Sequence, residues 1–176
     1  MRMKNNLYYF KLHSDVKDPI RATKGSACFD LHASLPESSE VKVYLNIFLH
    51  GTLEKWNRLV KNGKVEINSN ERVLIPTGLV IDIPEEHSIR LYQRSSLALK
   101  KGLTLANNVG IIDSDYVEPV FMMVYNISGS PQYISNGERI CQAELVREEG
   151  TLLMESDYRP EKKTDRDGGF GSTGKE

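Results

Sequence analysis

The sequence lacks the cysteine and histidine patterns that hold structural metals or redox-active disulfides. Its two cysteines, Cys28 and Cys141, lie far apart, and its four histidines are scattered without a His-x-x-x-His or Cys-x-x-Cys spacing. A zinc site built from the protein's own side chains is therefore not expected. Two cysteines outside any disulfide or metal pattern predict a protein of a reducing compartment, such as the cytosol.

Long apolar runs and a large net charge are missing too. No run of about 18 apolar residues and no signal-peptide layout occurs, which predicts a soluble protein with no membrane partner. The formal net charge is −1, and this balance argues against broad binding to nucleic acid or to anionic membranes. A small, local anion site is compatible with it.

Turn residues and short apolar-alternating segments dominate what remains. With 176 residues, the chain is long enough for one domain with a proper core. The segments expected to form strands are 7–12, 41–49, 72–76, 79–83, 88–92, 120–127, 132–134, 139–147 and 151–154. Many short strands at close spacing, with almost no helix, predict an all-β, jelly-roll-like β-barrel.

One segment has helical periodicity instead. Thr52 is suited to an N-cap, Gly63 follows the segment, and the apolar residues between them recur at helical spacing: Leu53, Trp56, Leu59 and Val60. This pattern predicts an amphipathic helix over residues 52–61. The simplest interpretation is a helix that packs on the body of the barrel.

The segment 107–116 reads Asn-Asn-Val-Gly-Ile-Ile-Asp-Ser-Asp-Tyr and carries an apolar run straight into two carboxylates, Asp113 and Asp115. If the strand continued, both acids would share one face, where they repel each other and are costly to desolvate. The pattern is typical of a strand that ends in an acidic turn, and equally of a site where a carboxylate performs chemistry. Asp115 is expected to be structural and to pair with a nearby arginine or amide.

Three further segments carry groups suited to phosphate oxygens. The tripeptide Arg94-Ser-Ser supplies one fixed cation and two hydroxyls beside the free amides of a short helical turn. Gln142 places an amide inside an apolar strand. The Gly-rich tail mimics a phosphate loop, but Glu176 stands where that loop needs Ser or Thr, which excludes a Walker A motif. Taken alone, these segments are more typical of an ordinary surface, a satisfied core amide and a disordered end, respectively.

Taken together, these segments resemble the motifs of the trimeric dUTPase family, in the family's own order. The five matching segments are 25–31, 94–98, 107–116, 137–142 and Arg166 with 168–174. Any one of them is weak, but five in order, ending in Gly-Gly-Phe-Gly-Ser-Thr-Gly, form a specific signal.

The resemblance implies Mg²⁺-dependent hydrolysis of dUTP to dUMP and pyrophosphate, which keeps uracil out of DNA and supplies dUMP for dTMP synthesis. Asp113 would be the general base that activates a water for in-line attack on the α-phosphorus. The triphosphate would hold most of the metal. Asp30 would either contact the metal through water or brace Arg94.

The resemblance also implies the substrate contacts. The expected phosphate ligands are Arg94, Ser95, Ser96, Gln142 and, from the tail, Arg166, Gly171, Ser172 and Thr173. A β-hairpin that contains Asn107, Gly110, Ile111 and Ile112 would read the base through its backbone polarity. Phe170 would cover the uracil, Tyr116 would exclude a 2′-hydroxyl, and Phe121 would contact the substrate through its backbone.

Organisation and partners follow from the same resemblance. We expect a barrel over residues 1–160 with an insertion at about 44–68, and a flexible Gly-rich arm over 161–176 that closes the site. Family members are homotrimers with shared sites, so we expect a homotrimer in the cytoplasm of a bacterium or of a phage-infected host. A further hypothesis is that Leu53, Trp56 and Val60 of the insertion dock a protein partner.

Two other functions stay open. A dCTP deaminase shares the fold, but it needs a catalytic Glu and an Arg soon after Ser-Ser-x-Ala, where this chain has Leu99. A regulatory nucleotide binder would use the pocket only to switch its affinity for a partner. Asp113, Tyr116 and the complete tail favour hydrolysis over both.

Overall fold

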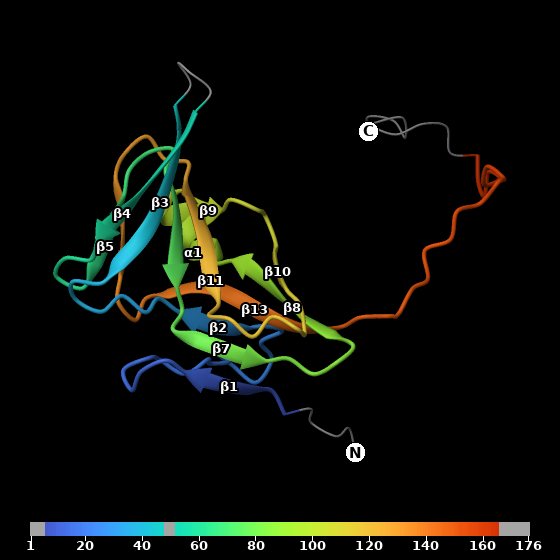
Figure 1. Ribbon diagram of the computed structural model, residues 1–176, viewed down its shortest axis with the longest axis horizontal. Coiled ribbons are helices and arrows are strands. Elements are labelled where there is room, and N and C mark those ends of the chain that lie inside the picture. The colour runs from blue at the N-terminus through green and yellow to red at the C-terminus, as the bar shows by residue number, and fades with distance from the viewer. Residues whose placement is uncertain (1–5, 48–51, 166–176) are drawn as a thin grey trace.

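The structure is a computed structural model that describes residues 6–47 and 52–165 (Figure 1). These residues form thirteen strands and one helix: β1 (Tyr8–Lys11), β2 (Phe29–His32), β3 (Glu40–Ile47), β4 (Thr52–Leu59), β5 (Lys64–Ile67), β6 (Arg72–Pro76), β7 (Leu79–Asp82), β8 (His87–Gln93), α1 (Ser95–Lys101), β9 (Leu103–Leu105), β10 (Gly110–Ile112), β11 (Phe121–Asn126), β12 (Gln132–Ser135) and β13 (Arg139–Arg147). The all-β prediction is confirmed, and β6 and β13 have the predicted bounds.

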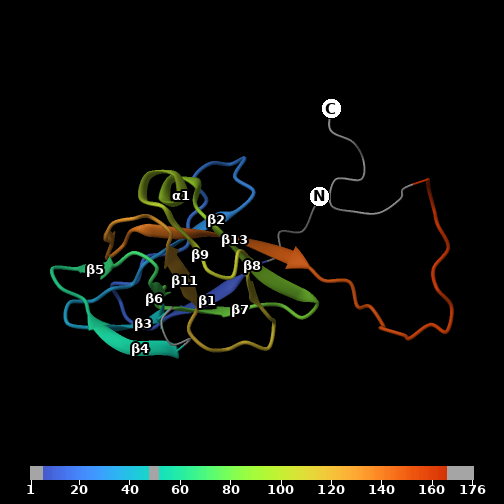
Figure 2. The same cartoon turned by 90° about the horizontal axis from the view of Figure 1, so that it is seen from above.

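Two antiparallel sheets enclose the core. One has the strand order β10-β8-β13-β2 and the other the order β4-β3-β6-β11-β9, while β1–β7 and β12–β5 form two small sheets (Figure 2). The inward residues of the two large sheets are almost fully buried: Leu31, Ile89, Leu91 and Ala143 from the first, and Val43, Val73, Ile75, Met122 and Val124 from the second. Because side chains alternate along a strand, the intervening residues face outward and are available for binding.

The predicted helix over residues 52–61 is wrong. Residues Thr52–Leu59 form β4, which pairs with β3 along its whole length, from Glu40 opposite Leu59 to Ile47 opposite Thr52. The apolar spacing fits a helix. Trp56 and Val60 are four residues apart, however, and this spacing also puts two side chains on the same face of an extended chain. Pairing with β3, which the spacing cannot reveal, decides between the two periods.

The β3–β4 hairpin is the part of the expected insertion that projects from the barrel (Figure 1). Val60 is only 1% exposed, and Val65 and Ile67 are fully buried, so the later part of the 44–68 segment contributes to the core. Trp56 is half-buried and packs against the same core. Of the three side chains proposed for partner docking, Leu53 alone is exposed.

The chain leaves the body after β13 (Figures 1 and 2). The strand predicted at 151–154 is wrong: Leu152, Leu153 and Met154 are not in a strand and are more than four-fifths exposed. An extended segment therefore begins well before the expected boundary at residue 161. In the described part of the chain, no helix has the length and apolarity to cross a membrane.

A buried ion pair ties the hairpin to the barrel. Arg58 of β4 donates from both terminal nitrogens to Glu71, which is 3% exposed. Glu71 also accepts hydrogen bonds from the backbone and side-chain amides of Asn68, at 2.8 and 3.1 Å. Burial raises the pKa of the Glu71 carboxyl, but the hydrogen bonds from Arg58 and Asn68 together lower it by more. The pKa therefore lies below its ordinary value of 4.5.

We predict that Glu71→Gln lowers the free energy of unfolding by about 3 kcal/mol at neutral pH, because Arg58 is left without its counter-charge. Since the folded-state pKa is lowered, this stability is present above the ordinary pKa of Glu71 and is lost as pH falls through the lowered value. Urea unfolding of both proteins at neutral and acidic pH measures the difference. Glu86→Gln, which removes the exposed partner of Arg147, is the control and should change stability little. An equal loss in both variants would contradict the prediction.

Candidate functional site

A pocket of about 290 Å³ opens beside the end of β10. Seven residues expected at the site line it: Asn107, Gly110, Ile111, Ile112, Asp113, Tyr116 and Phe121. Apolar side chains from three other strands and from β11 complete its walls: Leu74, Leu91, Leu105 and Met123. The pocket therefore combines apolar surface, exposed strand backbone and one carboxylate, which suits a flat polar ring with a charged extension.

The pocket exists because the chain crosses from one sheet to the other between β9 and β10. β9 pairs with β11, whereas β10 pairs with β8. The expected β-hairpin is wrong in this respect, because β9 and β10 do not pair with each other. Asn108 turns the chain at φ +60°, and a Cβ on the buried Gly110 would lie 3.2 Å from that of Leu91. Glycine thus lets β10 approach β8 closely.

The two carboxylates do not lie on a strand. β10 ends at Ile112, and a turn follows in which the Tyr116 N–H donates to the Asp113 carbonyl at 3.2 Å. Asp113 is exposed at the pocket, and its carboxylate has no hydrogen-bond or ion-pair partner within residues 6–47 and 52–165. The same holds for Asp115, so the expected pairing with an arginine or amide is not found. The Tyr116 hydroxyl donates to the Pro119 carbonyl at 3.0 Å, which fixes its ring.

A second cluster of expected site residues lies on the outer face of the sheet β10-β8-β13-β2. Gln142 stands opposite both Asp30 and Tyr92, so these three side chains share that face. Asp30 is only 4% exposed and forms ion pairs with two arginines, to Arg139 at 2.9 Å and to Arg94 at 3.3 Å. The ion pair with Arg94 supports one of the two roles considered for Asp30, which is to brace Arg94.

Arg94 also marks the start of α1. It is the N-cap residue, with extended backbone angles and no side-chain cap, so Ser95 and Ser96 open the helix. The first N–H groups of a helix have no intrahelical acceptor. The two serine hydroxyls, these amides and the Arg94 guanidinium are all groups that can donate hydrogen bonds to an anion.

The two clusters do not share a cavity within one chain. The pocket at Asp113 is lined by none of Arg94, Ser95, Ser96 and Gln142. The tail residues Arg166, Phe170, Gly171, Ser172 and Thr173 lie outside the described residues. One chain thus brings together the expected base and sugar contacts in one place and the expected phosphate contacts in another.

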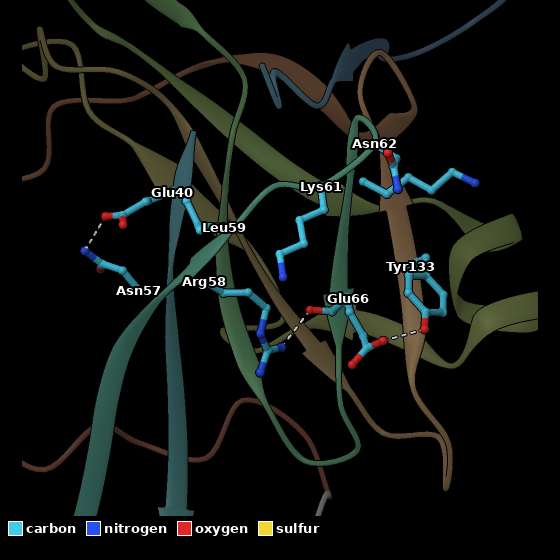
Figure 3. Close-up of a pocket in the computed structure, with 9 residues that line it drawn as sticks. Glu40, Asn57, Arg58, Leu59, Lys61, Asn62, Glu66 and Tyr133 are labelled. Carbon is cyan, nitrogen blue, oxygen red and sulfur yellow. Dashed lines mark hydrogen bonds between the residues drawn. The ribbon is translucent and has the colours of Figure 1, made fainter. Parts of the chain in front are cut away.

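A larger hollow, of about 670 Å³, lies between β4, β5 and β12 and contains no expected site residue (Figure 3). Some of its polar groups are paired with one another. Tyr133 donates to Glu66, and Arg58 donates to the Glu66 carbonyl at 2.7 Å (Figure 3). Arg58 is also committed to Glu71. Its carboxylates are hydrogen-bonded, Glu40 to Asn57 and Glu66 to Tyr133, so the hollow lacks the unpartnered carboxylate of the Asp113 pocket, although Lys61 and Lys64 also line it.

The family model for dUTPase matches residues 59–174 of the chain. The chain belongs to the dUTPase family. It is 44% identical over 118 residues to a deoxyuridine 5'-triphosphate nucleotidohydrolase of Finegoldia magna, covering 66% of this chain and 81% of that protein. It is 34% identical over 161 residues to the one of Fusobacterium nucleatum, covering 91% of each chain.

Solved dUTPase structures share the fold. A dUTPase of Staphylococcus bacteriophage 80alpha matches with a TM-score of 0.74 at 19% identity, covering 97% of this chain and 99% of that one. A dUTPase of Streptococcus mutans matches with a TM-score of 0.61 at 23% identity, covering 86% of this chain and all of that one. At these identities the likeness concerns the jelly-roll-like fold.

Within the dUTPase site, Arg139 was not among the expected residues. It lies in the matching segment 137–142, but nothing in the sequence shows that its side chain reaches Asp30, which is 109 residues away in the chain. The apolar wall formed by Leu74, Leu91 and Met123 was missed for the same reason. Pairing of β11 with β6 sets Met123 opposite Leu74, whereas Leu91 comes from the other large sheet.

The two cysteines of the dUTPase motifs differ in accessibility. Cys28 is half-buried, and burial followed by the nearby Glu144 raises the pKa of its thiol. Cys141 is fully buried, and burial raises its pKa to about 12. A thiol with a raised pKa carries little reactive thiolate at neutral pH.

We predict that the folded protein reacts with a thiol reagent at Cys28 only. The rate should rise with pH, because the raised pKa of Cys28 keeps the thiolate fraction low at neutral pH. Absorbance with a disulfide reagent at several pH values, followed by peptide mapping, measures this. Cys28→Ser should leave no reactive thiol until denaturant is added. Labelling of Cys141 in folded protein at the rate of Cys28 would contradict the prediction.

Proposed function

We propose that this chain hydrolyses dUTP to dUMP and pyrophosphate, with Mg²⁺ bound to the substrate and Asp113 as the general base. One observation supports the proposal above all. In a chain of the dUTPase family, the unpartnered Asp113 carboxylate lines the same pocket as the residues that connect β9 to β10.

The Asp113 carboxylate would act on the attacking water. It lies at the pocket without a protein partner in the described residues, so it can accept a hydrogen bond from a water and then its proton. The water oxygen forms a bond to the α-phosphorus as the bond to the bridging oxygen breaks, and pyrophosphate leaves. A positioned general base contributes about 10²–10⁴-fold to such a rate.

Specificity comes from the rest of the pocket. The backbone of β10 and the side chain of Asn107 present fixed donors and acceptors to the base, so cytosine would face mismatched groups. The Tyr116 ring, held through its hydroxyl, lies where the sugar would enter and excludes a 2′-hydroxyl. Phe121 borders the same pocket and contacts the substrate through its backbone.

The phosphates are held by the second cluster: Arg94, Ser95, Ser96 and Gln142, with Arg166, Gly171, Ser172 and Thr173 from the tail, while Phe170 covers the uracil. In the described part of the chain, no group of three or more His, Cys, Asp or Glu could hold a metal alone. Mg²⁺ would be held by the triphosphate and, through water, by Asp30, whose Oδ1 has no hydrogen-bond partner. When bound, it neutralises phosphate charge and polarises the leaving pyrophosphate.

The separation of the two clusters supports a homotrimer with shared sites. Because the Asp113 pocket lacks Arg94 and Gln142, a complete site needs the phosphate cluster of another subunit beside it. Docking of a further protein to the β3–β4 hairpin stays a hypothesis, and it now rests on the exposed Leu53.

Substitution of Asp113 tests the reaction. With dUTP, dCTP, dTTP and UTP as substrates, we expect turnover of dUTP, release of pyrophosphate without ammonia, and a fall of about 10²–10⁴-fold in kcat for Asp113→Asn. Asp115→Asn is the matched control and should change kcat little. A loss within a few-fold for Asp113→Asn would refute the base assignment. Ammonia release would indicate a deaminase, and binding without turnover a regulatory binder.

Mixing of two inactive variants tests the shared site. Co-expressed Asp113→Asn and Arg94→Met subunits should recover about a quarter of wild-type activity, since a site is intact only when each contributing subunit supplies its unmodified residue, with a chance of about one half each. Each variant expressed alone is the control. No recovery in assembled mixed oligomers would place both residues of a site in one chain.

A further inference from the structure

The buried carboxylate of Asp30 contacts two arginines, and the two contacts differ in geometry. The Arg139 Nη1 donates a well-formed hydrogen bond to Oδ2 at 2.9 Å. The Arg94 Nε lies 3.3 Å from Oδ1, near enough for an ion pair but without hydrogen-bond geometry. Asp30 therefore binds Arg139 firmly and Arg94 loosely.

The loose contact leaves unused hydrogen-bonding capacity. In the described part of the chain, four buried polar side-chain atoms have no hydrogen-bond partner, and Asp30 Oδ1, Arg94 Nε and the neighbouring His32 Nδ1 are three of them. A carboxylate normally accepts both arms of a guanidinium in a bidentate pair, which is the stronger arrangement. Something must therefore keep Asp30 and Arg94 from closing onto each other.

Arg94 is held from another side. Its Nη1 donates to the backbone carbonyl of Arg139 at 3.2 Å, and its side chain is 20% exposed. This anchor is independent of the Arg139 side chain, because it uses the main chain. The Arg94 guanidinium thus keeps this hydrogen bond only as long as Asp30 does not draw it into a bidentate pair.

We propose that Arg139 is a positioning residue for the phosphate site: its side chain occupies and neutralises Asp30, and so keeps the Arg94 guanidinium free for phosphate. The inference rests on the proposed phosphate-binding function of Arg94. Without the Arg139 side chain, both Asp30 oxygens are open, and Arg94 forms the bidentate pair with Asp30 instead. The charge of the cluster also falls from +1 to zero, which further weakens the attraction for an anion.

A direct contact between Arg139 and phosphate is the alternative to action through Asp30. If Arg139 acts only through Asp30, its loss matters only while Asp30 is charged. If it touches phosphate itself, its loss matters equally with or without Asp30. A double-mutant cycle separates the two, because it measures whether two substitutions act on one interaction.

The experiment measures the dissociation constant for dUDP by calorimetry, with kcat and KM for dUTP alongside, in wild type, Arg139→Met, Asp30→Asn and the double variant. We expect Arg139→Met to weaken dUDP binding by about 10-fold or more, and to change it less than about 2-fold in the Asp30→Asn background. Arg139→Lys, which keeps a cation beside Asp30, should retain most of the affinity. Arg147→Met, an exposed arginine of the same strand, is the control and should bind as wild type does.

Equal losses from Arg139→Met in both backgrounds would overturn the proposal, and so would the absence of dUDP binding by the wild type. A loss that follows only a lower melting temperature would show a structural role, and Arg139→Lys and the double variant report on this if Arg139→Met folds poorly. Non-additive binding in a chain that turns over no nucleotide would support the positioning role and refute the proposed hydrolysis instead. The two proposals can thus fail separately.

Discussion

The crossing of the chain between the two large sheets is the constraint on which the site depends. β9 pairs with β11 and β10 with β8, so residues 106–109 must carry the chain from one large sheet to the other. Gly110 allows the close approach to Leu91 that this path requires. Because β10 then ends after three residues, Asp113 emerges from the sheet into a turn, where no strand neighbour satisfies its carboxylate. In a longer strand, Asp113 and Asp115 would share one face, and their carboxylates would repel each other.

A second constraint acts at the phosphate cluster, where the charge of Arg94 must be held in place without being neutralised. Asp30 is buried on the outer face of its sheet, and a buried carboxylate needs counter-charges. Two arginines meet this need, yet only one of them binds it with good geometry. The barrel thus uses one strong ion pair to hold a second cation in place while leaving it able to bind an anion.

The strands could be predicted from alternation and turn residues, which are local signals, and the site motifs from their resemblance to those of the dUTPase family. β6 and β13 follow their predicted bounds, and seven expected residues meet in one pocket. The failures arise where pairing with another segment, which the residue pattern does not reveal, decides the structure. Residues 52–59 look helical until β3 pairs with them, Leu152 and Leu153 look strand-like but lack a partner strand in the described residues, and Arg139 gains its importance from Asp30.

In the proposed reaction, water activated by Asp113 attacks the α-phosphorus of dUTP. Hydrolysis in water enriched in oxygen-18, followed by mass spectrometry of both products, tests it most directly. Attack on the α-phosphorus leaves the heavy oxygen in dUMP and none in pyrophosphate, which is the result this account predicts. Heavy oxygen in the pyrophosphate would mean attack on the β-phosphorus, and it would contradict the position assigned to Asp113.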